Sequence, residues 1–144
     1  MSMLKVIYWS GTGNTKTMAQ AVVNGAKKAG AEVELVDVSS IDAAQALKVD
    51  ALALGCPAMG AEVLEEDEME PFVAALESAG LGGKKLGLFG SYDWGDGEWM
   101  REWKERMEKA GATLIGEGVM AHNAPDADSL SSCESLGVAL AKKA

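Results

Sequence analysis

The sequence predicts an α/β protein in which five parallel strands form a doubly wound sheet with helices on both faces. Two observations carry this prediction. Short apolar runs alternate with stretches of helical periodicity along the whole chain, and several of the runs are apolar throughout, as strands buried on both faces are. The 144 residues suffice for one core, so we expect a single domain over residues 1–144. In such folds the ligand crevice lies beyond the carboxyl ends of the strands.

The individual elements follow from the position of these patterns. The expected strands are 4–9, 32–38, 50–55, 84–92 and 113–119. Apolar residues spaced by three and four predict one helix from Met18 to Ala29 and another from Trp99 to Ala110. Weaker helices are expected at 42–48, 67–79 and 127–143, with helix ends marked by Gly30, Gly80 and Gly111. The functional loops are therefore 10–15, 56–62, 91–98 and 120–126.

Composition excludes several classes of function. The formal net charge of −9 disfavours nucleic acid and anionic membrane surfaces as partners and favours a basic partner. No apolar run approaches the roughly 18 residues that span a bilayer, and the first residues lack a signal-peptide pattern, so we expect a cytoplasmic protein. Cys56 and Cys133 are far apart and belong to no Cys/His cluster, so we expect two free thiols and no metal site.

The loop Ser10-Gly11-Thr12-Gly13-Asn14-Thr15 leaves the first strand and enters a helix, whose free N–H groups form an anion site. A phosphate is the expected guest, because the two glycines let it approach the backbone and the hydroxyl and amide groups can donate hydrogen bonds. The spacing fits neither the Walker loop nor the dinucleotide fingerprint, which needs a small residue where Lys16 stands. For these glycines alone, a capped helix start is an equally good interpretation.

Two further loops of the same crevice carry a large soft or aromatic side chain. Met59 follows the third strand and Trp94 follows the fourth. Both side chains suit a sandwich around a flat aromatic ligand, because tryptophan stacks well and methionine is polarizable. The alternative is that they only cover the end of the sheet, and spacing alone favours it slightly.

Three segments, VIYWSGTGNT, LGCPAMGAEVLEE and LFGSYDWGDGEWM, occur in this order, and with them the chain resembles the flavodoxins. The resemblance runs over essentially the whole chain and is to the short-chain clostridial type, which lacks a long insertion in the last strand. It implies the flavodoxin-like fold with strand order 2-1-3-4-5 and a noncovalently bound FMN.

The resemblance also implies roles for particular residues. Loop 10–15 would hold the phosphate, Met59 and Trp94 would lie on opposite faces of the isoalloxazine, and Glu62 would bind flavin N3–H. Ser91, Gly95 and Asn123 match positions that contact the ribityl chain or the pyrimidine end. The expected cofactor-binding set is Ser10, Gly11, Thr12, Gly13, Asn14, Thr15, Pro57, Ala58, Met59, Gly60, Glu62, Ser91, Tyr92, Asp93, Trp94, Gly95 and Asn123.

Two positions depart from the family pattern, namely Asp93 in place of glycine and Ala61 in place of aspartate. These departures affect the tuning of the redox steps and the conformational preference of the turn Met59-Gly60-Ala61-Glu62. The resemblance implies that the Gly60 peptide in this turn flips on reduction. Because alanine resists positive φ, Ala61 is expected to favour the flipped form.

The function implied is that of a low-potential one-electron carrier, not an enzyme, which cycles between semiquinone and hydroquinone to shuttle electrons between redox enzymes. Segment 62–70 holds six acidic residues and no basic one, and Asp93, Asp96 and Glu98 follow on the next loop. These carboxylates would disfavour a further negative charge on the flavin and would attract redox partners with basic docking surfaces to a monomer. Acidic residues at a solvated helix start are the alternative interpretation of segment 62–70.

Other functions on this kind of fold fit less well. A flavoenzyme such as a quinone reductase needs an acid or base in these loops, and His122 is expected to be an ordinary loop residue. A receiver domain needs an aspartate where Cys56 stands, and a low-molecular-weight phosphatase needs a cysteine in the first loop. Trp9, Trp99 and Trp103 are expected to be mainly structural, the first at a strand end and the others on a helix stripe.

Overall fold

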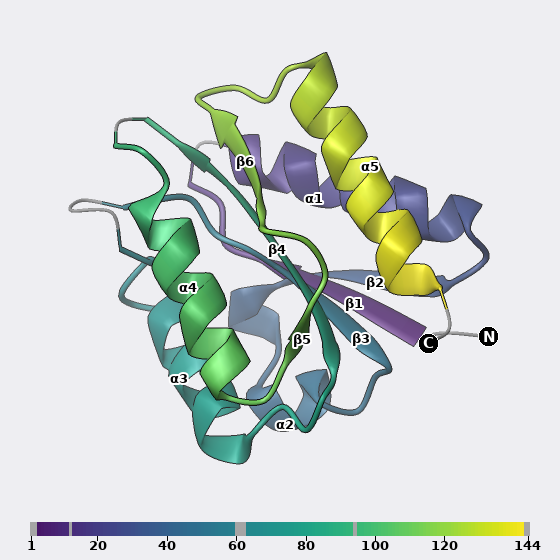
Figure 1. Ribbon diagram of the computed structural model, residues 1–144, viewed down its shortest axis with the longest axis vertical. Helices are drawn as coiled ribbons and strands as arrows, with labels where there is room; N and C mark the ends of the chain where they lie inside the picture. Colours follow the sequence, from purple (N-terminus) through teal and green to yellow (C-terminus); the bar gives the residue numbers. More distant parts are fainter. Residues whose placement is uncertain (1–2, 12, 60–62, 94, 143–144) are drawn as a thin grey trace.

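The computed structural model describes residues 3–11, 13–59, 63–93 and 95–142 and shows a parallel sheet between two layers of helices (Figure 1). The sheet order is β2-β1-β3-β4-β5, and β6 also pairs with β4, which confirms the predicted fold and strand order. The strands are β1 (Met3–Tyr8), β2 (Glu32–Asp37), β3 (Ala51–Gly55), β4 (Lys85–Tyr92), β5 (Thr113–Leu114) and β6 (Val119–His122). The helices are α1 (Asn14–Lys28), α2 (Ala43–Ala46), α3 (Met69–Ala79), α4 (Glu98–Lys109) and α5 (Ala127–Ala141), and a 3-10 turn, η1 (Val38–Ser40), precedes α2.

Each face of the sheet has its own apolar core. Alternate residues of a strand point to opposite faces, so Leu4 and Val6 of β1 pack with α1 and α5, whereas Ile7 packs with α3 and α4. Figure 1 shows these two pairs of helices on opposite sides of the sheet. All residues of β3 are buried, which explains why the central strands lack polar alternation in the sequence.

Helices α1 and α5 approach each other at two glycines. A Cβ atom on Gly25 would lie 2.0 Å from the carbonyl oxygen of Glu134, and one on Gly137 would lie 2.1 Å from that of Val22. Any larger residue at either position would force the helices apart. The first and the last helix of the chain are therefore in direct backbone contact.

The final strand differs from the prediction of one strand over 113–119. It consists of β5, which pairs with the N-terminal part of β4, and β6, which pairs with the C-terminal part of β4. The chain leaves the sheet between them at Gly116 and Gly118, both with positive φ, and a Cβ on Gly118 would lie 2.6 Å from Met100 Sδ. Because β6 extends the sheet to His122, the predicted loop 120–126 is shorter and begins at Asn123.

Most other boundaries agree with the sequence within a few residues. The main difference is α2, which is a single turn over 43–46 capped by Asp42 through a hydrogen bond from Gln45 N–H of 2.8 Å. The predicted helix ends at Gly30, Gly80 and Gly111 are confirmed, with positive φ at all of them. None of the helices in the described residues is both long enough and apolar enough to cross a membrane.

Candidate functional site

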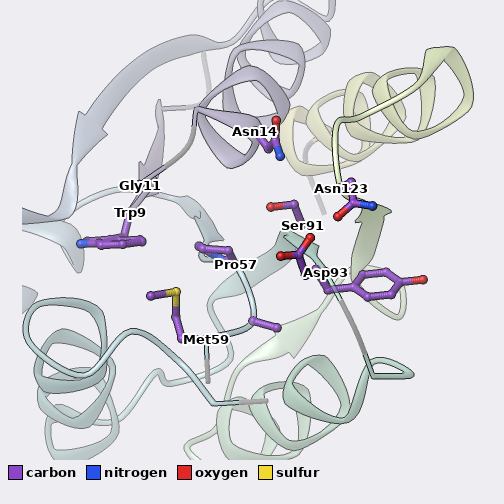
Figure 2. Close-up of a pocket in the computed structure, with 10 residues that line it drawn as sticks. Trp9, Gly11, Asn14, Pro57, Met59, Ser91, Asp93 and Asn123 are labelled. Carbon is purple, nitrogen blue, oxygen red and sulfur yellow. The ribbon is translucent and has the colours of Figure 1, made fainter. Parts of the chain in front are cut away.

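A pocket of about 200 Å³ lies at the carboxyl ends of the central strands (Figure 2). It is formed by the segments that follow β1, β3 and β4, together with Asn123 after β6. The residues lining it are Trp9, Gly11, Asn14, Pro57, Ala58, Met59, Ser91, Tyr92, Asp93 and Asn123. All of them except Trp9 belong to the set predicted from the sequence, so the fold brings three separated motifs together at one place.

The loop after β1 presents the N-terminus of α1 to this pocket. Gly13 caps the helix with φ of 98°, a conformation that residues with a side chain rarely adopt. The Ser10 Oγ accepts hydrogen bonds from the backbone N–H groups of Gly13 (3.1 Å) and Lys16 (3.3 Å). Among the described residues its O–H has no acceptor, so it can be donated to a ligand. Thr12 lies outside the described residues.

The hydroxyl groups of Thr15 and Ser91 link this loop to β4. Both residues are buried, and their oxygen atoms are 3.2 Å apart, with either one able to donate. Both were predicted as cofactor contacts, and the structure places Ser91 on the pocket wall and Thr15 directly behind it. The pair fixes the first turn of α1 against the end of the fourth strand.

The segment after β3 forms an apolar wall. Ala58 N–H donates to the Ser91 carbonyl at 3.0 Å, so this segment continues the parallel pairing beyond β3. Met59 and Val63 exchange two backbone hydrogen bonds of 2.8 and 3.0 Å across the intervening turn. The turn residues Gly60, Ala61 and Glu62 lie outside the described residues, as does Trp94, so their predicted roles are untested by this geometry.

Trp9 is the residue that the sequence analysis did not place in the site. Its ring packs against the core on the α3 side, as expected of a residue at a strand end, but it also lines the pocket. The indole Nε1–H donates to the Glu68 carboxylate at 3.2 Å, and a Cβ on Gly11 would lie 3.1 Å from the ring. Figure 2 shows Trp9 and Met59 on one side of the pocket and Asn123 on the other. In the sequence, the position of Trp9 directly before the glycine loop was the signal that could have placed it in the site.

The segment after β4 is held by β6. His122 Nε2 lies 2.8 Å from the Asp93 carbonyl oxygen, which can only accept, so the imidazole carries hydrogen on Nε2 and donates it. Asn123, with φ of 59°, donates its backbone N–H to the Tyr92 carbonyl at 2.8 Å. His122 is thus an exposed strand-end residue with a specific partner rather than an ordinary loop residue. Gly95 is exposed and is not among the residues that line the pocket.

Within the acidic segment before α3, Glu65 is buried, unlike the solvated rim that the sequence suggests. Its carboxylate accepts hydrogen bonds from the backbone N–H groups of Asp67 (2.8 Å), Glu68 (2.7 Å) and Met69 (2.9 Å). Burial by itself raises the pKa of Glu65, but these three hydrogen bonds to the charged form outweigh it, and the pKa is lowered. Glu65 is therefore a charged cap for the start of α3.

Two acidic residues of α3 and one in the loop after β4 pair with basic residues of α4. Arg106 of α4 donates two parallel hydrogen bonds of 2.8 and 2.9 Å to Glu70 and a third of 2.5 Å to Glu77. Arg101 pairs with Asp96 at 3.0 Å. Segment 62–70 itself contains no basic residue, and the fold pairs its last residue, Glu70, with Arg106. Glu66, Asp67 and Asp93 have no ion-pair partner within the part of the chain that the structure describes.

The two thiols are free, as predicted, and both are buried. Burial raises the pKa of Cys56 and of Cys133 to about 12, so neither is a nucleophile near neutral pH. Across the described ranges, no group of histidine, cysteine and acidic side chains is arranged to hold a metal ion.

The chemistry of the pocket fits a phosphorylated, flat aromatic ligand. Uncharged donors at the start of α1 suit a phosphate, and none of the described lining residues is basic, so the site would rely on backbone N–H groups and hydroxyls. Trp9, Pro57 and Met59 offer apolar surface to a ring system. The fold and the pocket define an α/β protein that binds its ligand at the point where the strand order reverses, between β1 and β3.

Comparison with known proteins identifies the family. The sequence profile of the family "Flavodoxin" matches residues 6–137. The chain is 48% identical over 143 residues to flavodoxin of Megasphaera elsdenii, covering 97% of this chain and 99% of that one. It is 46% identical over 123 residues to flavodoxin of Clostridium beijerinckii, covering 85% and 88%. The solution structure of two-electron reduced Megasphaera elsdenii flavodoxin superposes with a TM-score of 0.86, covering 98% of this chain and 100% of that chain at 47% identity.

The chain therefore belongs to the flavodoxin family and is of the short-chain clostridial type. Flavodoxins are electron-transfer proteins rather than enzymes, and the cofactor is FMN. They are themselves a standard example of the rule that places the ligand at the switch point between β1 and β3. They act together with redox partner proteins.

Proposed function

We propose that this chain is a low-potential one-electron carrier that shuttles electrons between redox enzymes by cycling its FMN between semiquinone and hydroquinone. The observation that carries the proposal is the composition of the pocket wall. Its described lining includes the carboxylate of Asp93 and no basic side chain, and Glu68 contacts the neighbouring Trp9. A site that already holds negative charge disfavours one more, so the last electron is held weakly and is given up readily.

The protein supplies binding and orientation, and FMN supplies the electron chemistry when it is bound. We assign the phosphate to Ser10, Gly11, Thr12, Gly13, Asn14 and Thr15. Pro57, Ala58 and Met59 would face one side of the ring system, with Trp94 on the other and Gly60 and Glu62 at its polar edge. Ser91, Tyr92, Asp93, Gly95 and Asn123 would hold the remaining contacts. Trp9, which the structure adds to the pocket, joins this set.

The partners that fit this surface are redox proteins with basic docking patches. The formal charge of −9 attracts such proteins from a distance, and a transient complex suits a carrier that must leave after each transfer. We propose that it acts as a single-domain monomer over residues 1–144, since a monomer leaves the pocket edge accessible. A cytoplasmic location suits two buried cysteines that remain free thiols.

Three measurements test the proposal. The apoprotein should be titrated with FMN and with riboflavin by calorimetry. FMN should bind far more tightly, because riboflavin lacks the phosphate that the α1 loop receives. Equal affinity for the two flavins would contradict the assignment of that loop.

The holoprotein should then be titrated spectroelectrochemically. Two separated one-electron steps, the second at low potential, are the expected result. A single two-electron step would contradict the proposed carrier cycle. Electron transfer to a basic redox protein should slow as the salt concentration rises, because screening weakens the steering.

A further inference from the structure

Trp99, on the first turn of α4, touches both walls of the pocket from behind. Its indole Nε1–H donates a hydrogen bond of 3.1 Å to the carbonyl oxygen of Cys56, where the segment leading to Met59 begins. Its ring lies 5.7 Å from that of Tyr92, centroid to centroid, at the start of the loop leading to Trp94. The buried side chain of Trp99 therefore contacts both the segment after β3 and the segment after β4, which would flank the flavin.

The residue whose carbonyl Trp99 binds is paired with β4 through its N–H, in a short row of backbone hydrogen bonds. Cys56 N–H donates to the Phe89 carbonyl at 3.1 Å, and Ala58 N–H donates to the Ser91 carbonyl at 3.0 Å. Pro57, between them, has no N–H to add. The indole hydrogen bond thus supplies a lateral restraint on this segment, directed from the helix layer rather than from the sheet.

We infer that Trp99 is a positioning residue for the cofactor. Through the Cys56 carbonyl and the Tyr92 ring it fixes the spacing between the Met59 wall and the Asp93 wall, and so it influences FMN affinity and both reduction potentials. The inference rests on the FMN site proposed above. It assigns a specific task to a side chain that the helix pattern alone marks as core.

Trp103, one turn further along α4, is a matched control. The two residues are 2% and 1% exposed and lie in the same core cluster. Within the described residues, the buried Nε1–H of Trp103 has no hydrogen-bond partner. Replacement by phenylalanine removes similar volume at both positions, but only at Trp99 does it also remove a hydrogen bond to the segment that leads into the pocket wall.

The first test uses the apoprotein and amide hydrogen exchange measured by NMR. Trp99→Phe should accelerate exchange at the amide of Ala58, whereas Trp103→Phe should leave it at the wild-type rate once both are corrected for global stability. Equal rates at Ala58 in the two variants would overturn the inference. This readout does not depend on flavin binding, so it stands apart from failure of the proposed function.

The second test uses the protein loaded with FMN. Trp99→Phe should weaken FMN binding by a factor of about five, the effect expected from one lost buried hydrogen bond, and should shift at least one of the potentials. Trp103→Phe should change neither. A Trp99→Phe protein that is less stable but has unchanged affinity and potentials would mean that Trp99 is only a core residue, and it would overturn the inference.

A measurement on the wild-type protein covers the case in which Trp99→Phe does not fold. FMN binding should shift the indole Nε1–H resonance of Trp99 more than that of Trp103. Equal or absent shifts at Trp99 would overturn the inference, whereas a wild-type protein that binds no FMN would instead contradict the proposed function.

Discussion

His122 donates a hydrogen bond of 2.8 Å from its imidazole Nε2 to the backbone carbonyl of Asp93. The two residues are brought together by β6, whose last residue pairs with Tyr92 of β4. The imidazole ring also lies 5.0 Å from the Tyr92 ring, centroid to centroid. The only histidine of the chain therefore holds the backbone directly before Trp94, on the wall of the pocket.

Removing this hydrogen bond should loosen the pocket wall. His122→Ala is expected to weaken FMN binding about fivefold, the usual effect of one lost hydrogen bond, because Asp93 loses its restraint. His122→Gln retains an N–H donor of similar reach and should recover most of the affinity. Fluorescence titration of the apoproteins with FMN checks both. If both variants bind like the wild type, His122 does not position the loop.

Charge removal at Asp93 should raise the potential of the second reduction step. Its carboxylate is exposed, lines the pocket and has no ion-pair partner among the described residues, so Asp93→Asn makes added negative charge less unfavourable. The rise should be on the order of 20 mV because solvent screens the interaction, and it should shrink at high salt. Spectroelectrochemistry measures it. Asp96→Asn is the control, since this carboxylate lies outside the pocket lining and pairs with Arg101.

Glu65 should make the stability of the protein sensitive to acid. Its pKa in the folded state is lowered from 4.5, so its contribution is fully present above that pH and is lost as the pH falls through the folded-state pKa. Glu65→Gln should lower the free energy of unfolding by about 1–2 kcal/mol at pH 7, because the charged helix cap is lost. The difference from the wild type should shrink below pH 4.5.

Urea unfolding at several pH values measures this effect. Glu66→Gln is the matched control, because Glu66 is exposed and adjacent, and it should change stability by less than about 0.5 kcal/mol. A difference between Glu65→Gln and the wild type that stays constant down to pH 3 would show that the cap is not held by charge.

Arg106 should stabilise the packing of α3 against α4. Its hydrogen bonds to Glu70 and Glu77 raise its pKa above the ordinary value, so it stays charged under all test conditions. Arg106→Met should lower the free energy of unfolding by about 2 kcal/mol, since it leaves two partly buried carboxylates without their donor. Arg101→Met, which breaks an exposed pair on the same helix, should cost less than about 1 kcal/mol. Equal losses in thermal or urea unfolding would contradict the special role of Arg106.

The central elements of the fold follow from the sequence because their physics is local. Strand β3 is apolar throughout since both faces of it are buried, and the glycine loop before α1 is recognisable because a phosphate site needs these residues in succession. Gly116-Glu117-Gly118 marks a break in the last predicted strand, but the sequence does not show that the chain returns to β4 as a second strand at Val119. The departure from the sheet depends on how Gly118 meets Met100 of α4, a contact between distant parts of the chain.

The same limit applies within the site. The loops after β1, β3 and β4 could be assigned to one crevice because parallel strands end at the same edge. The pairing of Arg106 with Glu70 and the burial of Glu65 could not be assigned, since both depend on the approach of α3 to α4 and on the path of the chain before α3. Trp9 was assigned only to the core from its place at a strand end, although its place directly before the glycine loop also allows contact with a ligand.

The contact between α1 and α5 has a consequence for the order of events during synthesis. Residues on α1 such as Ala21 and Val22 are covered in part by α5, so that part of their surface stays uncovered until α5 has left the ribosome. Contacts between such distant segments close late and slowly. Because the loop that we propose to hold the phosphate leads into α1, the nascent chain is expected to acquire FMN only after α5 has been synthesised and has packed against α1.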